Sequence, residues 1–171
     1  LEDYSCVEHR HVFDVGFIGF ITDKFDVGAV KKIAESGYKV AVYGEFYDGV
    51  VESALLRVEG VYLFGKFRGA DVPGILSSFK VGLIPYLVDR MHDESPLKLY
   101  QYLSSGLPVM SSFDFGVESE NVYLYAFENI MEVAAQALDR YPLGSARAGQ
   151  YYVENNWEAR VVPILDLIGI I

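Results

Sequence analysis

The chain has 171 residues, 51% of them hydrophobic, which is enough for one well-packed core and within the usual size of a single domain. A formal net charge of -10 argues against a duplex nucleic-acid binder, because such proteins gain most of their affinity by neutralising phosphates with Lys and Arg. The single cysteine excludes an internal disulfide and the usual multi-cysteine zinc frameworks, so we expect a reducing compartment, the cytoplasm.

The beginning of the chain does not resemble a secretory leader. It starts Leu1-Glu2-Asp3-Tyr4, without an initiator Met, a basic n-region or an apolar h-region. No apolar run approaches the roughly 18–20 residues that span a bilayer. We therefore expect one domain over residues 1–171, taken from a longer protein and without a transmembrane segment.

Short apolar runs alternate with longer amphipathic segments, which is typical of successive βα units. The sequence predicts an α/β fold, a Rossmann-like, doubly wound parallel sheet flanked by helices. The expected strands are 14–21, 38–43, 61–64, 80–85, 107–110 and a short one at 122–125. The expected helices are 27–36, 49–57, 71–78, one that opens at Ser95-Pro96, 128–140, 145–155 and 157–168.

Turn residues separate these elements. Gly16 and Gly19 keep the end of the first strand small, and Gly44 and Gly65 close the second and third strands. Pro85 ends the fourth strand because proline cannot donate a ladder hydrogen bond.

In open parallel sheets, ligands bind outside the carboxyl ends of the strands. The loops after strands one, three, four and five are therefore the candidates. The residues there that suit a nucleoside diphosphate sugar are Gly19 and the loop 21–26, Lys66, Phe67, Tyr86, Ser95, Pro96 and Lys98.

The helix that opens at Ser95-Pro96 carries the most specific pattern. Ser as N-cap and Pro at the first position leave N–H groups for a diphosphate, and Lys98 can reach back to the same phosphates. Gln101 shares the face of Lys98 and can bond sugar or ribose hydroxyls. In the alternative interpretation, Ser95-Pro96 is an ordinary helix cap, and Lys98 and Gln101 belong to a solvent-exposed face of the helix.

The roles of four other residues of the region also have two interpretations. Tyr86 and Phe67 offer flat surfaces for a base, or else belong to the core. Asp93 and Glu94 would repel a diphosphate, so they face sugar hydroxyls or complement the helix dipole.

The stretch 81–111, VGLIPYLVDRMHDESPLKLYQYLSSGLPVMS, resembles the donor-binding core of bacterial GT-B glycosyltransferases. That superfamily has a strand ending in Ile-Pro-Tyr-like residues, a loop, and then Ser/Asn-Pro-x-Lys-x-x-Glu-Tyr-x-x-x-Gly-x-Pro-Val. The start of the predicted terminal helix at Trp157-Glu158 is similar too. The resemblance implies a C-terminal, nucleotide-sugar-binding domain whose N-terminal acceptor domain is not in this chain.

The resemblance also implies roles for individual residues. Lys98 and Gln101 would contact diphosphate and ribose, Lys66 and Phe67 would hold a uracil, and Tyr86 would line the site. The general base belongs to the N-terminal domain, so we expect an incomplete enzyme that needs neither metal nor cofactor. Its expected reaction is transfer of glucuronate or a hexose from a UDP-sugar to a saccharide or glycolipid acceptor in polysaccharide biosynthesis.

Stereochemistry is the point at which the sequence departs from the pattern. Many retaining members have two glutamates separated by seven residues, and the matching positions here are Asp93 and Gln101. The segments 98–102 and 106–108 are more similar to the xanthan-type glucuronosyltransferases, which are inverting.

Two other classes share the predicted fold. A flavodoxin-like or receiver-type module would act through protein contacts, but the third strand is followed by Gly65-Lys66-Phe67 and not by a phosphoacceptor Asp. A GT-B nucleotide-sugar epimerase is the second alternative, because fold alone does not fix function. His9, His11 and His92 lack the partners of a zinc site, and nothing near Cys6 suggests an activating base.

Overall fold

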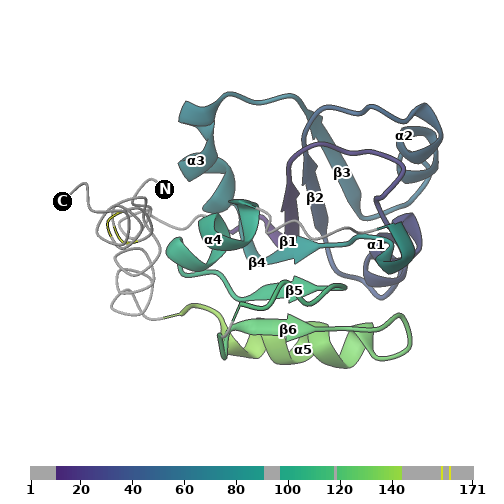
Figure 1. Cartoon of the computed structure of the whole chain (residues 1–171). Coiled ribbons are helices and arrows are strands. Elements are labelled where there is room, and N and C mark those ends of the chain that lie inside the picture. Colours follow the sequence, from purple (N-terminus) through teal and green to yellow (C-terminus); the bar gives the residue numbers. More distant parts are fainter. Residues whose placement is uncertain (1–10, 91–96, 118, 144–158, 160–161, 163–171) are drawn as a thin grey trace.

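A computed structural model describes residues 11–90, 97–117, 119–143, 159 and 162 (Figure 1). The strands are β1 (Phe13–Ile18), β2 (Val40–Tyr43), β3 (Val61–Gly65), β4 (Phe79–Ile84), β5 (Val109–Ser111) and β6 (Val122–Leu124). The helices are α1 (Val27–Glu35), α2 (Gly49–Leu55), α3 (Val72–Leu76), α4 (Leu97–Ser104) and α5 (Ile130–Arg140), with short 3-10 turns η1 (Gly69–Asp71) and η2 (Val88–Arg90).

All six strands are parallel and lie in the order β3-β2-β1-β4-β5-β6. The predicted doubly wound α/β fold is confirmed. The order reverses between β1 and β4, because the chain builds outward from β1 to β3 and then crosses back to β4 on the other side of β1. This reversal is the topological switch point at which ligands bind in such folds.

Two apolar layers cover the sheet. On one face, residues of α1, α2 and α5 pack on strand residues such as Val15, Val42 and Leu83. On the other face, α3 and α4 pack on Phe13, Phe79 and Val109, among others. Figure 1 shows α1 and α2 on the opposite side of the sheet from α3 and α4. The alternating faces of the strands thus supply both halves of the core.

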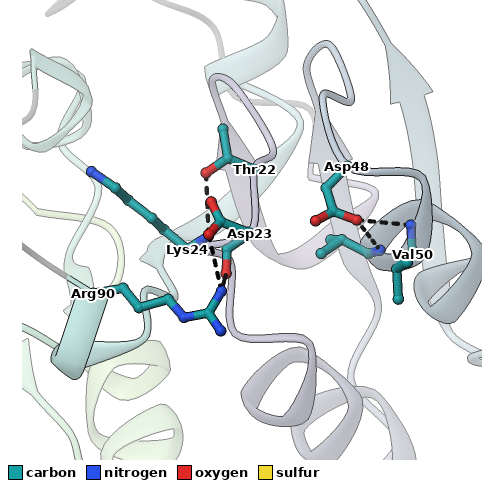
Figure 2. Close-up of polar contacts among 7 residues, drawn as sticks. Thr22, Asp23, Lys24, Asp48, Val50 and Arg90 are labelled. Carbon is teal, nitrogen blue, oxygen red and sulfur yellow. Dashed lines mark hydrogen bonds and ion pairs between the residues drawn. The ribbon is translucent and has the colours of Figure 1, made fainter.

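Side-chain patterns explain how individual helices begin. The Asp26 carboxylate accepts a hydrogen bond from the Ala29 N–H at 3.0 Å and caps α1. The Asp48 carboxylate accepts from the Val50 and Val51 N–H groups at 2.8 and 3.2 Å and caps α2 (Figure 2). Both caps satisfy N–H groups that the first helical turn leaves without a partner.

The prediction of the first strand was wrong at its end. The strand stops at Ile18 rather than at residue 21, because Gly19 has φ +135° and turns the chain out of the sheet. Ile21 instead forms an isolated parallel bridge with Phe46.

Several other boundaries also differ. The predicted helix 71–78 divides into η1 and the shorter α3, and the fifth strand begins at Val109, one residue beyond Pro108. The predicted helix 145–155 lies outside the described residues, as do Ser95 and Pro96. Of the predicted helix 157–168 only residues 159 and 162 are described, and both are helical.

Candidate functional site

A hollow lies at the switch point, where β1 and β4 separate. The two strands pair at Phe13–Phe79, Val15–Val81 and Gly16–Gly82. Beyond these pairs lies a space of about 480 Å³, which we name the lysine hollow. It is lined by Ile18, Gly19, Phe20, Thr22, Lys24, Phe67, Val72, Tyr86, Leu97, Lys98 and Gln101. The lining comes from the end of β1, from the loops after β1, β3 and β4, and from α3 and α4.

The structure brings five of the predicted site residues together in this hollow: Gly19, Phe67, Tyr86, Lys98 and Gln101. Lys66 lines a neighbouring hollow. Asp93, Glu94, Ser95 and Pro96 lie outside the described residues. Contact of any of these residues with a nucleotide stays a prediction.

Lys98 lines the lysine hollow and contacts two aromatic side chains. Its ammonium donates a hydrogen bond to the Tyr86 hydroxyl and lies 4.7 Å from the centroid of the Phe17 ring and 4.8 Å from that of Tyr86. Phe17 offers its ring face to the cation, whereas Tyr86 holds it through the hydroxyl group. A Cβ at Gly19 would come within 2.9 Å of Lys98 Cε and would displace the end of that side chain, and the φ of +135° also favours glycine at this position.

The helix that carries Lys98 is anchored by Tyr102, one turn further on. The buried Tyr102 hydroxyl accepts a hydrogen bond from the Ile18 N–H at 2.9 Å, and the ring fills space that a Cβ at Gly82 would occupy. Burial raises the pKa of the Tyr102 phenol. Because the hydroxyl bonds the last residue of β1, the position of α4 is tied to the end of that strand.

Tyr102 was not recognised from the sequence as a positioning residue. Its place on the apolar face of the helix predicts burial, but its hydrogen-bond partner, Ile18, is 84 residues away in the chain.

The loop after β1 is held from the side of β2. The Gly19 N–H donates to the Tyr43 carbonyl at 3.0 Å, and the Ile21 N–H donates to the Glu45 carbonyl at 3.0 Å. Gly44 has φ +154°, and a Cβ there would be 1.7 Å from the Gly19 oxygen. The two loops can approach this closely only because residue 44 is glycine.

The same loop is held from the side of β4 as well. The Leu87 N–H donates to the Lys24 carbonyl at 2.8 Å, and Phe25 forms an antiparallel bridge with Tyr86. The Arg90 guanidinium donates to the Asp23 carbonyl at 2.8 Å and to its carboxylate at 3.0 Å (Figure 2). The backbone that carries Lys24 is therefore fixed on both sides.

The electrostatic character of the lysine hollow is cationic. Among its described lining residues are two cations, Lys24 and Lys98, and no carboxylate. This contrasts with a chain whose formal net charge is -10. Lys24 was not singled out from the sequence, although it belongs to the candidate loop 21–26, because nothing local distinguishes it from a solvated lysine.

A second hollow, of about 400 Å³, adjoins the first, and we name it the Glu45 hollow. It is lined by Gly19, Phe20, Gly44, Glu45, Tyr47, Lys66 and Phe67. The Lys66 ammonium lies 3.2 Å from the Glu45 carboxylate, which also accepts a hydrogen bond from the Tyr47 hydroxyl at 3.1 Å. Lys66, followed by Tyr47, holds the pKa of the Glu45 carboxyl below its usual value. Lys66 is thus paired with a carboxylate, which the sequence did not indicate.

A third hollow, of about 820 Å³ and larger than these two, lies elsewhere, between α1 and α2. Its charged residues are of both signs, with Lys31, Lys39 and Arg57 beside Glu35 and Glu59. It contains none of the predicted site residues, and its mixed charge does not favour an anion. Size alone therefore does not identify the site.

Within the part of the chain that the structure describes, no helix combines the length and the apolar character that crossing a bilayer requires. No cluster of three or more His, Cys, Asp and Glu side chains arranged to hold a metal ion occurs among the same residues. Cys6, His9 and His92 lie outside them.

The chain has the fold of GT-B glycosyltransferases. No family model and no curated protein sequence matches it. It is similar to AviGT4, a glycosyltransferase involved in avilamycin A biosynthesis, with a TM-score of 0.71, 14% identity and coverage of 95% of this chain and 51% of that one. Anabaena HepE in complex with UDP and glucose has a TM-score of 0.65 and 14% identity, over 93% and 48% of the two chains.

A third structure agrees with these two. A mutant of T4 phage BGT in complex with UDP-glucose has a TM-score of 0.61 and 9% identity, over 92% of this chain and 48% of that one. The chain thus spans about half the length of these structures.

Proposed function

We propose that this chain is the donor-binding, C-terminal domain of a glycosyltransferase that uses a nucleoside diphosphate sugar, with UDP as the nucleotide. The observation that carries the proposal is the lysine hollow. Two lysines line a space at the switch point of the sheet, and no carboxylate occurs in its described lining. A diphosphate is the anion that such a hollow, beside a flat aromatic wall, suits best.

The complexes of similar structures support the same ligand. HepE holds UDP and glucose, and T4 phage BGT holds UDP-glucose. In our proposal Lys24 and Lys98 bind the diphosphate, Gln101 bonds ribose or sugar hydroxyls, and Tyr86 and Phe67 flank the nucleotide. Asp93, Glu94, Ser95 and Pro96 complete the site from the segment before α4, and Lys66 contributes to nucleotide-sugar binding from the adjoining Glu45 hollow.

The proposed chemistry divides between two domains. When the sugar leaves, negative charge develops on the diphosphate, and the ammonium groups of Lys24 and Lys98 stabilise it. A general base of the N-terminal acceptor domain, which we propose completes the enzyme, would activate the acceptor hydroxyl. The proposed product is a saccharide or glycolipid extended by glucuronate or a hexose in polysaccharide biosynthesis.

Calorimetric and thermal-shift titrations with UDP, GDP, ADP and UDP-glucuronate test the proposal. We expect UDP to raise the unfolding temperature. At a UDP concentration of 100 times Kd, binding adds about 2.7 kcal/mol to the free energy of unfolding. Lys24→Met and Lys98→Met should each weaken UDP binding about 10- to 100-fold, since a hydrogen bond to a charged group contributes about 1.5–3 kcal/mol.

Lys31→Met is the matched control, because Lys31 lies in the hollow between α1 and α2. Its UDP affinity should equal that of the wild type. Absence of any nucleotide response, or equal losses in all three variants, would contradict the proposal.

A further inference from the structure

The Glu45 hollow has two aromatic side chains that are unusually exposed. Phe20 is 65% exposed and Tyr47 is 64% exposed, and their rings meet edge to face at a centroid distance of 5.4 Å. Clustered exposed apolar groups at the rim of a cleft are typical of a binding surface. Aromatic rings offer a flat apolar face against which the C–H groups of a pyranose ring pack.

The charges of this hollow differ from those of the lysine hollow. Glu45 and Lys66 compensate each other, whereas the lysine hollow carries two cations in its described lining. The lowered pKa keeps Glu45 ionised at neutral pH, and a carboxylate only accepts hydrogen bonds. Because Lys66 compensates this carboxylate, the hollow offers a phosphate no net positive charge, and Glu45 favours neutral ligands that donate through hydroxyl groups.

The Glu45 hollow is also held in shape. The Tyr47 N–H donates to the Ile21 carbonyl at 2.8 Å, and the Ile21 N–H donates to the Glu45 carbonyl at 3.0 Å. These bonds join the loops after β1 and β2 and fix the backbone below the aromatic pair. A site whose backbone is fixed loses less entropy when it binds.

The two hollows share three lining residues, Gly19, Phe20 and Phe67. A group bound in one hollow therefore lies beside a group bound in the other. A volume of about 400 Å³ falls within the range of roughly 300–1,000 Å³ that small-molecule sites occupy.

From this geometry we infer that the Glu45 hollow is a sugar subsite, in which Phe20 and Tyr47 pack against a neutral pyranose ring and Glu45 accepts hydrogen bonds from its hydroxyls. The inference rests on the proposed function, because the sugar would lie next to the diphosphate in the lysine hollow. The ring could belong to the donor or to the acceptor saccharide, and the same chemistry would hold either.

Titrations of the chain with UDP, UDP-glucose and methyl β-D-glucopyranoside, followed by NMR, test this inference. The variants are Glu45→Gln, Tyr47→Ala and Tyr47→Phe, with Glu52→Gln on the exposed face of α2 as the matched carboxylate control. Unchanged amide spectra away from the hollow would show that each variant is folded.

We expect Tyr47→Ala and Glu45→Gln to weaken sugar binding at least 5-fold, and Tyr47→Phe to weaken it less because the ring remains. UDP affinity should change less than 2-fold in every variant. A loss confined to UDP-glucose identifies the donor sugar as the occupant, and a loss for the methyl glucoside identifies an acceptor.

Three results would overturn the inference. The first is that wild-type protein binds UDP-glucose no more tightly than UDP and does not bind the methyl glucoside. The second is sugar binding that Tyr47→Ala and Glu45→Gln leave unchanged. The third is an equal loss of UDP in these variants, which would assign the hollow to the nucleotide. Absence of UDP binding in the wild type would instead reject the proposed function.

Discussion

Replacing Tyr102 by Phe removes one hydroxyl from the junction between α4 and β1. The hydroxyl accepts the Ile18 N–H at 2.9 Å in a buried position, and the Tyr102 side chain is 0% exposed. Without it, a buried N–H loses its acceptor, which costs about 1–3 kcal/mol of unfolding free energy. The ring still fills the space over Gly82, so no large cavity adds to that cost.

Urea denaturation of wild type and Tyr102→Phe measures this cost. The midpoint should fall while the slope m stays constant, because the surface exposed on unfolding is the same. Tyr62→Phe is the control, since Tyr62 is 43% exposed on β3 and its change should stay within about 0.5 kcal/mol. If Tyr102→Phe also stays within that limit, the hydroxyl does not anchor α4 and our account of how Lys98 is positioned is refuted.

Three more changes have expected outcomes. Gly19→Ala would put a Cβ 2.9 Å from Lys98 Cε on a residue whose φ is +135°, and we expect this backbone strain to lower the free energy of unfolding by about 1–3 kcal/mol. Because the Cβ also displaces Lys98, UDP binding measured by calorimetry should be at least 10-fold weaker, and wild-type affinity would contradict this. Leu99→Ala empties a fully buried position of α4 and should cost about 2–5 kcal/mol in urea, whereas a loss below 1 kcal/mol would show that α4 is loosely packed. Burial raises the pKa of Tyr141 to about 12 and also raises that of Tyr102. Below pH 10 both phenols are neutral in the folded and the unfolded chain, so the free energy of unfolding should keep its full value there and fall as the pH rises from about 10 toward 12. Unchanged urea midpoints over this range would contradict the expectation.

The general fold follows from patterns that operate within short stretches of the sequence. Apolar runs of β1, β2 and β4 are bounded by turn residues, and the amphipathic segments between them become α1 and α2. The parallel order follows from the same alternation. The predicted end of β1 was wrong because apolar residues continue past Gly19 to Ile21. The positive φ of Gly19 ends the strand although the apolar run goes on.

The site was predictable where a general rule about strand ends applies. That rule selects the loops after β1, β3, β4 and β5, and the lysine hollow contains Gly19, Phe67 and Lys98 from the first three of these regions. Pairings between distant residues were not predictable. Glu45 with Lys66, and Ile18 with Tyr102, depend on how loops and helices meet in space, and no local signal distinguishes these residues.

The most direct test of the central claim is an NMR titration of the isotope-labelled chain with UDP. The account predicts that the amide signals of Gly19, Lys24, Phe67 and Lys98 shift together and saturate with one Kd. Shifts concentrated at Lys31 and the rest of the hollow between α1 and α2, or no shifts at millimolar UDP, would contradict a nucleotide site at the switch point between β1 and β4.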